Sequence, residues 1–150
     1  MKRIVSKTLA FAAIMAMAAW AGALVLEVGN PDTDPEAKSL NAVVVARATA
    51  CHDPAKSTVT ATLVQFTRGE LQRTQLKVLP LKAAGTFAVI GAVPHGSVID
   101  LAVTNPEYRN YQPRVLIRGD GHGVDLASTR RFFSTQPTET DIRSVLGAVD

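Results

Sequence analysis

Between residues 41 and 128 the sequence alternates between short runs of β-forming residues and clusters of turn-forming residues, and this constrains the fold most. In 57–66, threonines alternate with apolar residues, as in a strand with one buried face. In 97–104, Asp100 lies on the face opposite to the apolar side chains. No helical crossover fits between consecutive runs, which argues against a parallel sheet. The pattern therefore predicts an all-β, antiparallel sandwich or barrel.

Seven strands are predicted in this domain, and turn signals such as Asp120-Gly121 separate them. They cover residues 41–50, 57–66, 75–79, 85–91, 97–104, 114–118 and 124–128. The side chains predicted to point into the core are Val59, Ala61, Leu63, Leu76, Val78, Phe87, Val89, Ile99, Leu101, Val103, Val115, Ile117, Val124 and Leu126.

Residues 1–23 have the features of a signal peptide. Three basic residues precede an apolar run that reaches Leu26, and small residues precede two possible cleavage positions, after Ala21 and after Ala23. This predicts a signal helix and an exported protein, periplasmic or secreted, that meets the membrane only transiently. An uncleaved anchor stays the alternative, because residues 9–26 reach the roughly 18-residue lower limit for a membrane span.

Two further segments flank the predicted β-sandwich domain at 41–128. Residues 24–40 are rich in acids and prolines, and we interpret them as a linker. Residues 129–150 form a C-terminal tail that contains a short predicted helix, capped by Thr138 or Thr140. One face of this helix carries Ile142, Val145 and Leu146.

Composition excludes several classes of function. Without residues 1–23 the chain has 13 basic and 13 acidic residues, and this neutrality argues against binding to nucleic acid or to an anionic membrane. A single cysteine cannot form an intrachain disulfide, a cysteine-rich zinc site or an iron–sulfur cluster. No recognisable nucleophile motif is present. We therefore predict a protein that is not an enzyme and needs no cofactor.

The stretch 85–119 resembles the carboxypeptidase-regulatory-like domains, a group of transthyretin-like β-sandwiches. The residues that carry the resemblance are Gly85, Phe87, Val93, Pro94, Gly96, Tyr108 and Gly119. The resemblance implies a non-catalytic module of exported proteins that contacts protein or carbohydrate or acts as a spacer. It supplies no catalytic residues.

Candidate binding residues lie in the predicted loops, where binding side chains are often found. If the chain reverses at every connection, His95 and His122 fall at one end of the domain together with Arg68. Tyr108 and Tyr111 fall at the other end, where they offer a contact edge; the alternative is that the ring of Tyr108 folds back to cap the core.

The alternative function is metal binding. Cys51 and His52, or the pair His95 and His122, carry donor atoms suited to copper or zinc. The unpaired thiol of Cys51 also allows an intermolecular disulfide, and an exposed sheet edge allows strand addition, so either route predicts a possible dimer.

Overall fold

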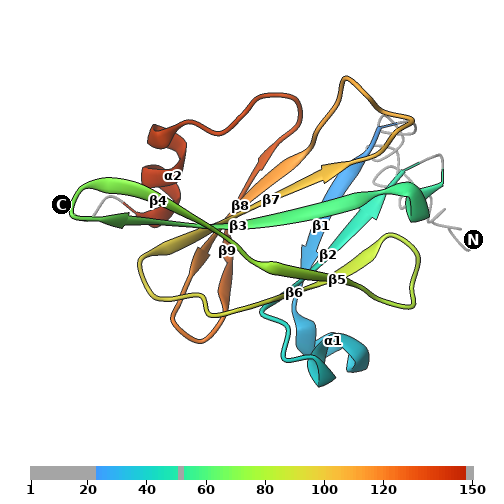
Figure 1. Cartoon of the computed structure of the whole chain (residues 1–150), viewed down its shortest axis with the longest axis horizontal. Coiled ribbons are helices and arrows are strands. Elements are labelled where there is room, and N and C mark those ends of the chain that lie inside the picture. The colour runs from blue at the N-terminus through green and yellow to red at the C-terminus, as the bar shows by residue number, and fades with distance from the viewer. Residues whose placement is uncertain (1–22, 51–52, 148–150) are drawn as a thin grey trace, which may run out of the picture.

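The computed structural model describes residues 23–50 and 53–147, and it contains two antiparallel sheets packed face to face (Figure 1). The four-stranded sheet has the order β1-β2-β6-β5, and the five-stranded sheet has the order β4-β3-β7-β8-β9. The strands are β1 (Val25–Gly29), β2 (Val44–Thr49), β3 (Thr58–Thr67), β4 (Glu70–Gln75), β5 (Lys77–Pro80), β6 (Thr86–Ile90), β7 (Ser97–Thr104), β8 (Arg114–Gly119) and β9 (Val124–Phe132). The predicted all-β, antiparallel sandwich is confirmed.

The described residues form nine strands, so the predicted count of seven is wrong. The first missed strand, β1, lies in the segment interpreted as a linker, followed by η2 (Pro31–Thr33) and α1 (Pro35–Ser39). β1 pairs with β2 from Val25 opposite Thr49 to Gly29 opposite Val45. Leu24 and Leu26 are buried in the core, although in the sequence they merge with the apolar run of the predicted signal peptide.

The second missed strand, β4, is continuous with β5 in the chain. β4 pairs with β3 in one sheet and β5 pairs with β6 in the other, and only Leu76 separates them. The N–H of Leu76 donates to the carbonyl of Ala61 at 2.9 Å. This run therefore crosses between the sheets and closes one side of the sandwich. β4 was missed because its residues are polar on both faces.

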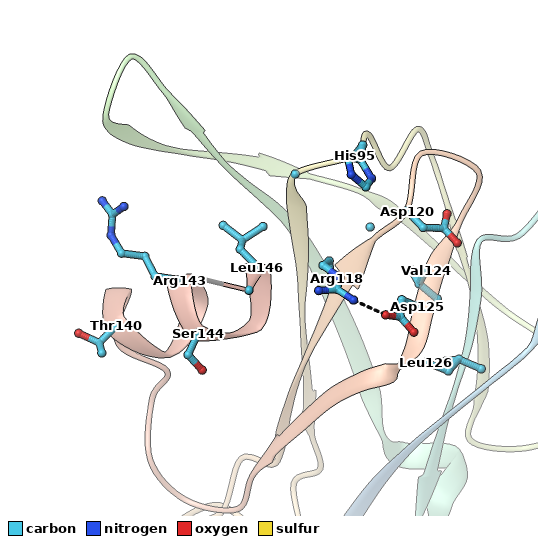
Figure 2. A pocket seen from close by; sticks show the side chains of 13 residues that line it. His95, Arg118, Asp120, Val124, Asp125, Leu126, Thr140, Arg143, Ser144 and Leu146 are labelled. Carbon is cyan, nitrogen blue, oxygen red and sulfur yellow. Dashed lines mark hydrogen bonds and ion pairs between the residues drawn. The ribbon is translucent and has the colours of Figure 1, made fainter. Parts of the chain in front are cut away.

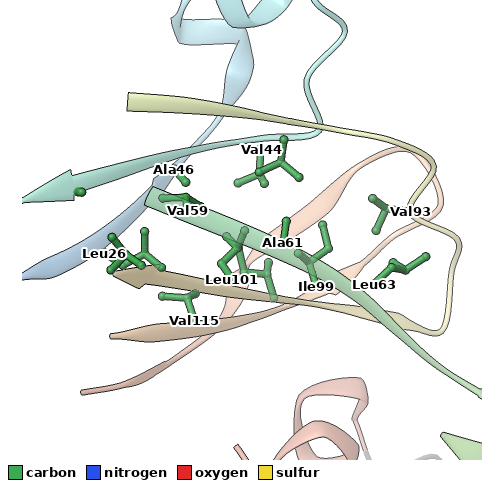
Figure 3. Close-up of a cluster of buried hydrophobic side chains, with 14 of the residues drawn as sticks. Leu26, Val44, Ala46, Val59, Ala61, Leu63, Val93, Ile99, Leu101 and Val115 are labelled. Carbon is green, nitrogen blue, oxygen red and sulfur yellow. The ribbon is translucent and has the colours of Figure 1, made fainter. Parts of the chain in front are cut away.

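The main core lies between the sheets (Figure 3). Every predicted inward residue except Leu126 belongs to this cluster or packs against it. Its buried members are Leu24, Leu26, Val44, Ala46, Ala48, Val59, Ala61, Leu63, Val89, Val93, Ile99, Leu101, Val103, Val115 and Ile117.

The predicted C-terminal helix is present as α2 (Glu139–Leu146), and it covers the outer face of the five-stranded sheet. Thr138 is the N-cap, and its side chain and that of Asp141 form a reciprocal capping box. Ile142 and Val145 are buried in a second cluster with Val64, Val98, Leu116 and Phe132. The predicted tail boundary was four residues early, because β9 continues to Phe132.

An ion pair lies on the same outer face. Asp100 is 3% exposed and accepts two hydrogen bonds from Arg114, at 3.1 Å from Nε and 2.6 Å from Nη2. Gln136 accepts a further bond from Arg114 Nη1 at 3.2 Å, and Arg73 lies 3.8 Å from the carboxylate. As expected, Asp100 faces away from the main core.

Most of the predicted signal peptide, residues 1–22, lies outside the described residues. Within the described part of the chain, no helix is long and apolar enough to span a membrane.

Candidate functional site

Two connections meet at one end of the sandwich. A β-carbon placed on Gly121, in the β8–β9 turn, would lie 3.8 Å from Cβ of His95, in the β6–β7 connection. Asp120 Oδ1 holds the turn by accepting the N–H groups of His122 at 2.8 Å and Gly123 at 2.7 Å. The predicted location of His95 and His122 at the same end is therefore confirmed.

A cleft of about 1030 Å³, which we call the α2 cleft, lies between this end of the five-stranded sheet and α2 (Figure 2). Most of its lining surface is apolar, although four charged side chains also contribute to it. It is lined by His95, Gly96, Arg118, Gly119, Asp120, Val124, Asp125, Leu126, Thr140, Arg143, Ser144, Leu146 and Gly147.

Arg118 lies in the middle of the α2 cleft, between the helix and β9 (Figure 2). Its Nη2 pairs with Asp125 Oδ2 at 2.5 Å, and its backbone N–H donates to Ser128 Oγ at 2.8 Å. Neighbouring Gly119 is packed tightly, since a β-carbon there would lie 2.5 Å from Val93 Cγ1. These contacts position the β8–β9 hairpin firmly against the β6–β7 connection.

A second, smaller cleft of about 290 Å³ lies on the other side of the hairpin, and we call it the η2 cleft. Three residues line both clefts: Asp120, Val124 and Leu126. We call these three the hairpin ridge, because they separate the two hollows. The remaining lining of the η2 cleft consists of Asn30, Pro31, Asp32, Ala42, Val43, His122 and Gly123.

Leu126 lines both clefts, and the sequence placed it wrongly. It was predicted to be in the core, but 36% of it is exposed on the hairpin ridge. The register between β8 and β9 shifts between Leu116 and Arg118, so that strict alternation fails just where Leu126 lies. The Asp125 side chain accepts the N–H of Ala127 at 3.1 Å within this irregularity.

The two histidines do not form one site. His95 lines the α2 cleft, whereas His122 lines the η2 cleft. Within residues 23–50 and 53–147, no three or more His, Cys, Asp or Glu side chains lie close enough to hold a metal ion. The other predicted metal ligands, Cys51 and His52, lie outside the described residues.

The remaining candidates lie away from both clefts. Arg68 is exposed at the tip of the β3–β4 hairpin with φ of 53°, at the same end as His95, because Gln65 pairs with Ser97. Tyr108 and Tyr111 lie at the opposite end and pack against the main core, which favours the capping alternative. That end is held together by an ion pair between Lys56 and Glu107, 2.8 Å long.

The carboxylates of Asp120 and Asp141 determine part of how the free energy of unfolding changes as the pH falls. The N–H groups of His122 and Gly123 lower the pKa of Asp120 below 3.8, and the N–H and hydroxyl of Thr138 lower that of Asp141. Their folded pKa values lie below the unfolded ones, so they stabilise the fold above about pH 4, and this contribution is lost as pH falls through the folded pKa.

We therefore expect the Asp120→Asn and Asp141→Asn variants to be less stable than the parent at about pH 5, with the difference shrinking toward about pH 2. Urea unfolding at several pH values measures this. A difference that stays constant with pH would contradict the assigned carboxylate stabilisation.

No protein family, no curated protein and no solved structure matches this chain significantly.

Proposed function

We propose that this chain is an exported, non-catalytic β-sandwich module that contacts a protein partner through the hairpin ridge and the α2 cleft. The observation that carries the proposal is Leu126, an aliphatic side chain 36% exposed between two hollows. The buried centre of a protein interface is more apolar than its rim, so an exposed apolar side chain beside concave surface suits such a centre. The motif residues between Gly85 and Gly119 support a module of the carboxypeptidase-regulatory-like type.

The lining of the two clefts favours protein over carbohydrate as the partner. Sugar rings commonly stack on aromatic side chains, and neither cleft is lined by Phe, Tyr or Trp in the described part of the chain. Tyr108 and Tyr111, the aromatic candidates for sugar contact, use their rings against the core.

Export is supported by the basic and apolar composition of residues 1–23. Cleavage after Ala21 or after Ala23 would leave β1, and the buried Leu24 just before it, in the mature chain. The proposed processing and the observed core are therefore compatible.

The test is site-specific photo-cross-linking in the native host. A photoreactive residue at position 126 should give one discrete protein adduct. The same residue at Phe133, which is 39% exposed and lines neither cleft, is the matched control. Adducts of equal yield at both positions, or none at 126, would contradict a partner at the ridge.

A further inference from the structure

The ridge and the α2 cleft lie next to each other on one face of the molecule. In Figure 2 the ridge residues lie on one side of Arg118 and α2 lies on the other. A convex apolar feature beside a concave one is self-complementary, because a two-fold rotation inserts each ridge into the cleft of the other copy. Leu126 would supply the inserted side chain, and Leu146 lies in the wall that receives it.

The charges of this surface also suit a contact between identical copies. The cleft holds two acids, Asp120 and Asp125, and two arginines, Arg118 and Arg143, so neither sign dominates. A surface with a large excess of one sign would repel its own copy.

Asp120 and Arg118 each have polar atoms that the hydrogen bonds described above do not use. The turn uses only Oδ1 of Asp120, and the pair with Asp125 uses only Nη2 of Arg118. In a two-fold dimer these atoms would allow Asp120 of one copy to pair with Arg118, beside His95, of the other, twice by symmetry.

We propose that the partner at the hairpin ridge is a second copy of this chain, in an isologous dimer with each Leu126 in the α2 cleft of the other copy. This inference rests on the proposed function of the ridge. It differs from strand addition at β9, because the irregular register near Leu126 disrupts that strand as a template.

Two further observations, one at each edge of the five-stranded sheet, also argue against dimer formation by strand addition. Arg131 Nη1 donates to the carbonyl of Leu26 at 2.5 Å, so a β9 side chain already engages β1. β4, an edge of the five-stranded sheet, is polar and exposed apart from Leu71, which offers little apolar area.

Sedimentation equilibrium tests the proposal. The protein is the chain from Ala23 to Asp150, which contains every described strand and helix, with Cys51→Ser to remove disulfide dimers. Between about 10 µM and about 1 mM we expect a reversible monomer–dimer equilibrium, as for an interface of modest area. Leu126→Asp should weaken association by at least about tenfold, as expected for a central side chain.

Two more variants test whether Leu126→Asp acts through its position on the ridge or only through the added charge. Phe133→Asp places the same carboxylate on an exposed hydrophobic residue outside both clefts, and association should stay within about twofold of the parent. His95→Glu puts a carboxylate opposite Asp120 of the other copy and should weaken association by about fivefold. Circular dichroism confirms that each variant is folded.

A chain that stays monomeric at about 1 mM, or equal effects of Leu126→Asp and Phe133→Asp, would overturn the dimer. These results leave the cross-linking experiment to decide the proposed function separately. A position-126 adduct with twice the chain mass supports both proposals, whereas an adduct with a different protein supports only the function.

Discussion

Replacing Arg114 by alanine should lower the free energy of unfolding by about 3–5 kcal/mol, because it leaves a buried carboxylate without its main partner. Asp100 is 3% exposed, and both of its oxygens accept hydrogen bonds from Arg114. Arg73 lies 3.8 Å away, but its side chain is 46% exposed and solvent screens it. Urea unfolding measures the change without adding ions.

The control is the double variant Asp100→Leu with Arg114→Leu. Apolar replacement of both partners in a buried pair is often close to neutral, so this variant should recover most of the lost stability. A loss below about 1 kcal/mol for Arg114→Ala alone would show that Asp100 is hydrated or adequately paired elsewhere.

Replacing Leu26 by alanine should cost about 2–5 kcal/mol, the range for removing a fully buried leucine side chain. Leu26 is 2% exposed and belongs to the main core, although it follows directly on the predicted signal peptide. Thermal or urea unfolding of the chain from Ala23 measures the effect.

Glu27→Ala is the matched control, because the next residue of β1 is exposed and its replacement should change stability by no more than about 0.5 kcal/mol. Equal effects at positions 26 and 27 would mean that β1 is not part of the folded core in solution.

The patterns of alternating and β-branched residues identified seven of the strands, including β7, which is buried on both faces, but they missed β4 and β1. β4 is exposed on both faces, so it has no apolar period to detect. β1 has the period, but Leu24 and Leu26 continue the apolar run of the leader. Leu126 was assigned to the core because a shift of register cannot be recognised from alternation alone.

The sequence predicted correctly which loops lie at the same end of the sandwich, although it missed two strands. β4 and β5 run in one direction, so omitting β4 left the sequence of reversals unchanged. β1 precedes all of the predicted strands, so omitting it did not change how those strands alternate in direction. His95, His122 and Arg68 therefore fall at one end, and Tyr108 and Tyr111 at the other, as expected.

The α2 cleft itself could not be predicted, because its walls come from three separate segments. The β6–β7 connection, the β8–β9 hairpin and α2 have no shared pattern in the sequence. The sequence identified the apolar face of α2, but it does not say against which strands this face packs.

The positions of Ala23 and Gly147, the two ends of the described part of the chain, decide how this molecule is presented when it is tethered. β1 starts beside Thr49, at the end that holds the 53–57 and 105–111 loops, whereas Gly147 lines the α2 cleft. A linker, fluorophore or membrane anchor joined before Ala23 therefore leaves the ridge facing outward, away from the support. A fusion placed after Gly147 emerges beside the cleft and would compete with whatever binds there.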